Sequence, residues 1–99
     1  VIRDEHTTTE GLRQLRAQID ELDNQLMDLL SRRMRVCREI GQYKREHNLT
    51  VLQASRYNEI LEKRGAQGSL IGISPESVAR IFEEIHEESV RQQLEIVNQ

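Results

Sequence analysis

The chain has 99 residues, enough for one domain but too few to bury a large share of its surface unless a partner adds to the core. Hydrophobic residues make up 36% of it, aromatic residues only 3%, and no apolar run approaches the length of a membrane span, which excludes a membrane protein. The net charge of −3 argues against a nucleic-acid-binding module, which normally has a basic surface.

The N-terminal end is polar and has no initiator Met, which predicts a linker or N-terminal extension at residues 1–11 ahead of a domain at residues 12–97. Cys37 is the single cysteine and cannot form an internal disulfide, and no signal-peptide pattern is present. These features favour a cytoplasmic protein.

The first long segment, residues 12–44, has an apolar residue at nearly every third or fourth position, which is typical of one helix face. These positions are Leu12, Leu15, Ile19, Leu22, Leu26, Leu29, Val36 and Ile40. A helix over 12–46 would be roughly 50 Å long, whereas a compact domain of this size has a radius of gyration of about 13 Å. One chain is too small to cover this apolar face along its whole length, and a second copy of the same helix is the simplest way to cover it. The sequence therefore predicts an intertwined homodimer.

Three helices and no strands are expected, one long, one short and one of medium length, so the predicted fold class is all-α. Thr7 and Glu10 have capping-box spacing for the start of the long helix, and its end is expected near His47 or Asn48. The short helix is predicted at about residues 53–64.

Gly65 is a plausible C-cap for the short helix, followed by a Gly-rich loop over residues 65–73. Leu70, Ile71 and Ile73 of this loop are expected to point inward. Ser74 and Pro75 form a strong helix start, so the third helix is predicted from there to about residue 96. Its buried face should carry Val78, Ile81, Phe82 and Ile85.

Cations interrupt the apolar stripe of the long helix. Arg33 and Lys44 fall on the same helix face as the apolar residues. A lone cation there would extend past the apolar face to solvent or pair with an acid of the partner helix, but two on one buried face favour a binding site. Arg16 lies one residue away from this face, and Arg56 lies on the short helix. Four cations converging in an acidic protein predict a pocket for a small anionic ligand.

Two neutral polar residues, Ser89 and Gln93, lie close to the apolar face of the third helix. A buried Ser or Gln must find a hydrogen-bond partner. The alternative for Ser89 is a small residue that permits close helix approach, and the alternative for Gln93 is exposure near the helix end.

The remaining chemically active residues indicate neither a metal nor a cofactor. His6, His47 and His86 lack metal-ligand spacing and are expected on the surface. Cys37 has no activating neighbour and is interpreted as a small buried hydrophobic residue. The glycines at 65, 68 and 72 match no nucleotide-binding spacing.

Over residues 12–97 the chain resembles the all-helical chorismate mutases. The matching segments include LLSRR at 29–33, IGQYK at 40–44 and IHEESVRQQ at 85–93. The resemblance implies an intertwined dimer whose pocket binds the dianion chorismate and rearranges it to prephenate without metal, cofactor or covalent intermediate. The residues implied are Arg33, Lys44, Arg56, Ser89 and Gln93 of one subunit, with Arg16 contributed by the other.

The resemblance also implies roles for these residues. Arg16 and Arg33 would bind the two carboxylates, and Lys44 and Gln93 would donate to the ether oxygen. Arg56 and Ser89 would complete the carboxylate contacts.

Two positions depart from the family pattern, which has acids that contact the ring hydroxyl of the substrate where this chain has Gln53 and Tyr57. Gln53 can still bind a hydroxyl, whereas Tyr57 is free to turn away.

Isochorismate pyruvate lyases share the scaffold and are the nearest enzymatic alternative. A helical dimerisation or regulatory module is the non-enzymatic alternative. The N-terminal end further suggests a domain cut from a bifunctional heptulosonate-phosphate synthase fusion.

Overall fold

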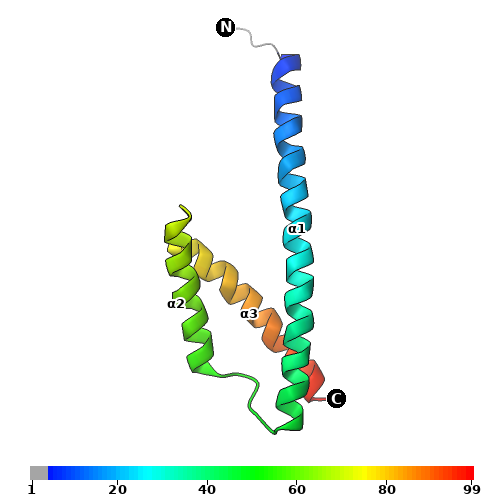
Figure 1. The fold of residues 1–99 in the computed structure, drawn as a ribbon, viewed down its shortest axis with the longest axis vertical. Helices are drawn as coiled ribbons and strands as arrows, with labels where there is room; N and C mark the ends of the chain where they lie inside the picture. The colour runs from blue at the N-terminus through cyan, green and yellow to red at the C-terminus, as the bar shows by residue number, and fades with distance from the viewer. Residues whose placement is uncertain (1–4) are drawn as a thin grey trace. The chain divides into compact units, whose positions relative to one another are not determined.

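The computed structural model describes residues 5–99, and over this range it contains three helices and no strand (Figure 1). The all-α prediction is confirmed. The chain divides into two compact units, one up to Arg33 and one from Met34 onward. No helix in the described range is both long enough and apolar enough to cross a membrane.

Helix α1 spans Glu5–Glu46. It begins earlier than predicted, so Thr7 and Glu10 lie within the helix and not at its start. The end agrees with the prediction: Asn48 follows it with φ at 55°, and its N–H and that of Leu49 donate to the carbonyls of Arg45 and Lys44. This pairing is a Schellman motif, in which a left-handed residue satisfies the last helical carbonyls.

Helix α2 spans Ala54–Leu70, six residues longer than predicted at its C-terminal end. The predictions of a C-cap at Gly65 and of a loop from there are wrong, because the helix continues through Gly65 and Gly68 to Leu70. A Cβ on Gly65 would only reach ordinary contact with the carbonyl oxygen of Pro75, at 3.6 Å, whereas a Cβ on Gly68 would lie 2.6 Å from the Val78 side chain. Gly68 therefore lets α2 approach α3 closely.

The turn after α2 is made by Gly72, whose φ of 79° suits glycine. Leu70, Ile71 and Ile73 are exposed in this single chain, so the prediction that they point inward is wrong here. Ile81 of the predicted buried face is exposed as well.

Helix α3 spans Pro75–Val97, close to the predicted bounds. Ser74 is its N-cap, because the hydroxyl oxygen accepts from the backbone N–H of Ser77 at 3.3 Å. Pro75 occupies the first turn, where its missing N–H costs nothing.

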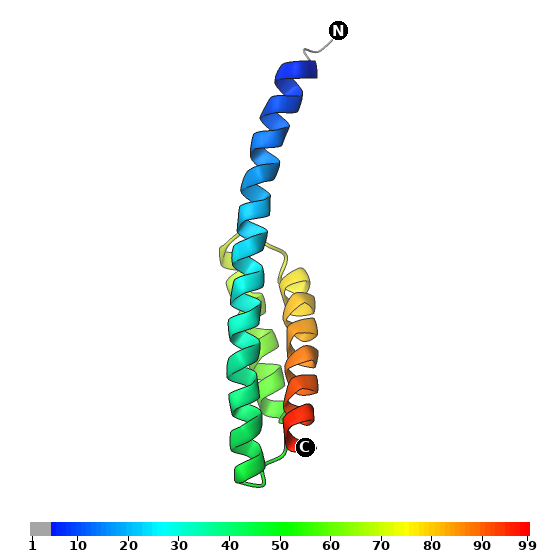
Figure 2. The same ribbon diagram turned by 90° about the vertical axis from the view of Figure 1, so that its right-hand side faces the viewer.

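The second unit has a small core built from the C-terminal part of α1, α2 and α3, and α2 and α3 lie side by side in it (Figure 2). Its buried apolar side chains are Cys37, Ile60, Val78 and Ile96. No large side chain in the described range is fully buried. The apolar stripe of α1 remains exposed along its length, from Leu12 to Ile40.

Candidate functional site

Lys44, in the last turn of α1, connects two other elements of the second unit. Its Nζ donates to the carbonyl oxygen of Val51 at 2.6 Å and to Oε1 of Gln93 at 2.9 Å. Burial lowers the pKa of Lys44 below its ordinary value, and the electrostatic interaction with nearby Cys37 offsets part of this effect. The structure therefore holds a partly desolvated cation between the α1–α2 loop and α3.

Gln93 and Ser89 are the buried polar residues of α3, with exposed fractions of 7% and 4%. The alternative, that Gln93 is exposed near the helix end, is thus excluded for this chain. The Ser89 hydroxyl donates to the carbonyl of Ile85 at 2.9 Å, one helical turn earlier. It also accepts from the Cys37 thiol at 3.3 Å, so α1 and α3 are joined at this level as well as at Lys44.

Gly41 explains how α1 and α3 come so close at the Lys44–Gln93 pair. A Cβ at this position would lie 3.1 Å from Cα of Gln93 and 3.3 Å from Cβ of Ile96. Because glycine has no Cβ, the two backbones can lie close enough for the hydrogen bond between Lys44 and Gln93 to form. Gly41 lies one turn before Lys44 on the same helix, which places the close approach beside the buried cation.

Arg56 and Gln53 lie near the start of α2. Arg56 is exposed and pairs with Glu59 on its own helix at 2.8 Å. Gln53 is the N-cap residue of α2, and its side-chain amide donates to the carbonyl of Thr50 at 3.4 Å. The structure therefore places both on the surface of the second unit, with partners close in sequence.

Arg16 and Arg33 belong to the first unit. Arg16 is exposed on α1, and Arg33 is half-buried there. Among the seven predicted substrate-binding residues, the structure therefore shows a direct hydrogen bond between Lys44 and Gln93.

A pocket of about 370 Å³ opens in the second unit between the start of α2 and α3. It is lined by Leu52, Ala54, Tyr57, His86, Glu87 and Val90. The Tyr57 ring lies 4.7 Å from the His86 ring. Desolvation, together with a hydrogen bond to Glu83, raises the pKa of the Tyr57 hydroxyl above its ordinary value. Tyr57 therefore faces α3.

His86 differs from its predicted surface position. It is half-buried, and its Nε2 atom is buried. The sequence placed His86 one turn before Val90 on α3, but nothing in the spacing indicated that the Tyr57 ring would pack against it from α2, tilted by 49°.

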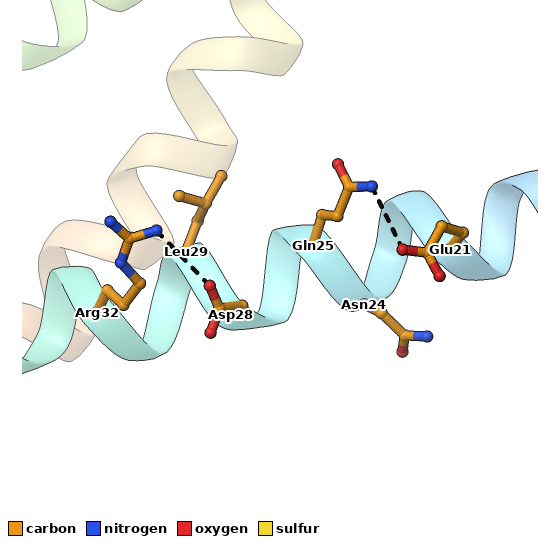
Figure 3. A pocket seen from close by; sticks show the side chains of 6 residues that line it. All are labelled: Glu21, Asn24, Gln25, Asp28, Leu29 and Arg32. Atoms are coloured by element: carbon orange, nitrogen blue, oxygen red, sulfur yellow. Dashed lines mark hydrogen bonds and ion pairs between the residues drawn. The ribbon is translucent and has the colours of Figure 1, made fainter.

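A second hollow, of about 430 Å³, lies along α1 in the first unit (Figure 3). All six lining residues come from this one helix: Glu21, Asn24, Gln25, Asp28, Leu29 and Arg32. Arg32 pairs with Asp28 at 3.7 Å, and Gln25 donates to Glu21 at 3.4 Å, both one turn apart. Such exposed pairs are ordinary helix-surface interactions, so this hollow is not the predicted anion pocket.

The chemistry available at Lys44 follows from its neighbours. An ammonium and a primary amide held side by side can donate together to an acceptor on which negative charge develops. Among the side chains that the structure describes, those of residues 9–99, no group of three His, Cys, Asp or Glu is arranged to hold a metal ion. Sequence reasoning missed two contributors, the main-chain carbonyl of Val51 and the thiol of Cys37, because neither carries a side-chain pattern that signals its contact.

Comparison with known proteins identifies relatives of this chain. A family model described as chorismate mutase type II matches residues 15–94. The chain is 29% identical over 80 residues to the T-protein of Haemophilus influenzae, with 81% of this chain and 21% of that protein covered. It is 30% identical over 83 residues to the 4-amino-4-deoxychorismate mutase of Streptomyces pristinaespiralis, with 84% and 64% covered.

A third relative is the bifunctional chorismate mutase/prephenate dehydratase of Aquifex aeolicus, 34% identical over 79 residues, with 77% of this chain and 22% of that protein covered. The chain thus spans about one fifth of the length of the T-protein and of the bifunctional enzyme.

Proposed function

The chain belongs to the chorismate mutase type II family, and from that premise we propose that it rearranges chorismate to prephenate. The observation that carries the proposal is the contact between Lys44 and Gln93, two residues that the resemblance places at the ether oxygen of the substrate. Residues 12–97 would form the catalytic domain.

The reaction breaks a C–O bond of the enolpyruvyl ether while a C–C bond forms, and it requires no proton transfer. Catalysis therefore depends on holding the reactive conformation and on stabilising the negative charge that grows on the ether oxygen. Lys44 and Gln93 suit the second task. An ammonium only donates, so the Gln93 atom that accepts from Lys44 must be its carbonyl oxygen, which leaves its NH₂ group to donate to the substrate.

The two carboxylates of chorismate need cationic partners, and a guanidinium group can bind a carboxylate through two parallel hydrogen bonds. We assign Arg16 and Arg33 to this task, with Arg56 and Ser89 completing the contacts. Arg56 would exchange Glu59 for the substrate. Because that ion pair is exposed, breaking it costs little, at most about 1 kcal/mol.

The proposed active form is an intertwined homodimer in which Arg16 comes from the partner subunit. The exposed leucines and isoleucines of α1 supply an apolar surface for a second copy, as do the exposed side chains at the α2–α3 turn. Arg16 and Arg33 are 17 residues apart, roughly 25 Å along one helix axis. Two side chains so far apart on one helix cannot bind the same small molecule.

Recognition of the ring hydroxyl is assigned to Gln53. The Tyr57 hydroxyl is engaged with Glu83, and its ring faces His86. Gln53 has only a long hydrogen bond to the Thr50 carbonyl, which a substrate hydroxyl can replace.

The test is to add purified protein to chorismate and, separately, to isochorismate, to follow the loss of each substrate and to identify the products. Prephenate supports the proposal. Pyruvate formed with salicylate from isochorismate would indicate the lyase alternative. No turnover of either compound, and no binding of either dianion, would favour a dimerisation or regulatory module.

A further inference from the structure

The α1–α2 loop contacts Lys44 at two places. The backbone carbonyl of Lys44 accepts from the N–H of Leu49 at 2.8 Å, and its ammonium donates to the carbonyl of Val51 at 2.6 Å. The same short loop therefore holds both the main chain and the side-chain end of this lysine. Both contacts lie within the second unit.

A lysine side chain is flexible because it can adopt many rotamers, and so its ammonium is a poorly directed donor unless it is held in place. In this structure two of the three ammonium hydrogens are directed, one to Val51 and one to Gln93. Because the ammonium is tetrahedral, the direction of the third N–H bond is then fixed. Donors oriented before the substrate arrives avoid reorganisation during the reaction.

We propose that the α1–α2 loop is a positioning device for Lys44, in which the left-handed turn at Asn48 and the main-chain carbonyl of Val51 fix the direction of the ammonium. This inference rests on the proposed function, since it assigns the loop a role in that reaction. Val51 and Asn48 are positioning residues and are not themselves in contact with substrate.

Asn48 is the residue on which the geometry depends. Its φ of 55° reverses the chain after α1, so that Leu49 returns to the Lys44 carbonyl and Val51 reaches the ammonium. Asn and Gly tolerate this conformation, whereas a β-branched residue is strained in it. The turn can therefore be perturbed without touching Lys44, Val51 or Gln93.

The experiment compares Asn48→Val with Asn48→Gly. Valine should open the turn and lower kcat by about 10- to 100-fold, the effect expected when a catalytic donor is misplaced by about 1 Å, with KM changed by less than about twofold. Glycine keeps the left-handed residue and should restore kcat to within about twofold of wild type. If Asn48→Val does not fold, Asn48→Ala replaces it, because alanine also disfavours this φ but lacks the branch.

A second measurement does not depend on turnover. The Lys44 ammonium in wild type should give a ¹H–¹⁵N NMR signal protected from solvent exchange, and this signal should disappear in Asn48→Val and persist in Asn48→Gly. Folded Asn48→Val with wild-type kcat, or with the protected signal retained, would overturn the inference. If wild type does not convert chorismate, the proposed function fails, and the NMR comparison still decides whether the loop holds the ammonium.

Discussion

Replacing Gly41 by alanine tests whether the close approach of α1 and α3 serves the Lys44–Gln93 pair. The new Cβ would lie 3.1 Å from Cα of Gln93, whereas carbon atoms in ordinary contact are about 3.5 to 4.0 Å apart. The backbone of Gln93 must therefore move by a few tenths of an ångström at this point. The 2.9 Å hydrogen bond from Lys44 to Gln93 would lengthen to about 3.2 to 3.4 Å, at or past the upper end of the usual range for a hydrogen bond from nitrogen to oxygen.

The expected result for Gly41→Ala is a fall in kcat of about 10- to 100-fold, since both donors to the ether oxygen shift together. The free energy of unfolding should change only modestly. Alanine improves helix propensity by about 1 kcal/mol, while overpacking costs about 1 to 3 kcal/mol, so the net loss in the free energy of unfolding should not exceed about 2 kcal/mol. The assays are chorismate consumption at saturating substrate and thermal unfolding followed by circular dichroism.

Gly11→Ala is the matched control, because among the described residues no heavy atom lies within 4 Å of the added Cβ. This variant should gain up to about 1 kcal/mol in stability and keep wild-type kcat. Wild-type kcat in folded Gly41→Ala would refute the reasoning, since the Lys44–Gln93 geometry would then be irrelevant to turnover.

Three further predictions concern charge and subunit exchange. Gln93→Glu should lower kcat near neutral pH and recover it as the pH falls toward about 5, because only the protonated carboxyl donates to the ether oxygen; a flat kcat–pH profile would contradict this. Since burial lowers the pKa of Lys44 in the ligand-free protein, wild-type kcat/KM should fall on the alkaline side with a midpoint below 10.5, and any activity of Lys44→Arg should lack that decline; a wild-type kcat/KM constant to pH 10.5 would count against Lys44 as the donor. Arg16→Ala and Arg33→Ala homodimers should each be nearly inactive, yet an equimolar mixture unfolded and refolded together should regain about a quarter of wild-type activity; mixed dimers without recovery would exclude a shared site.

The sequence was sufficient to predict the helices whose boundary signals are local. Ser74 and Pro75 start α3 because capping and a fixed φ act within one turn. The end of α2 was not predictable in this way. Gly65 looks like a helix end, but α2 continues through it to Gly68, whose missing side chain makes room for Val78 of another helix, a contact that no local signal reports.

The same distinction applies to the candidate site: positions set by helical periodicity were predictable, and contacts with other segments were not. The positions of Lys44 and Gln93 on apolar faces follow from helical periodicity, and the two side chains do contact one another. The carbonyl of Val51 is a main-chain group in a loop, so residue type gives no sign of it. His86 was assigned to the surface because no spacing rule reports the Tyr57 ring that packs against it from another helix.

The most direct test of the proposed mechanism measures prephenate formation from chorismate by wild type and by Lys44→Ala, with circular dichroism and sedimentation showing that both are folded in the same oligomeric state. We expect prephenate as the product of wild type. The kcat of Lys44→Ala should be lower by about 10²- to 10³-fold, the effect of removing one donor to a developing negative charge. Prephenate formed by Lys44→Ala at the wild-type rate, or no prephenate from the folded wild type, would contradict the mechanism.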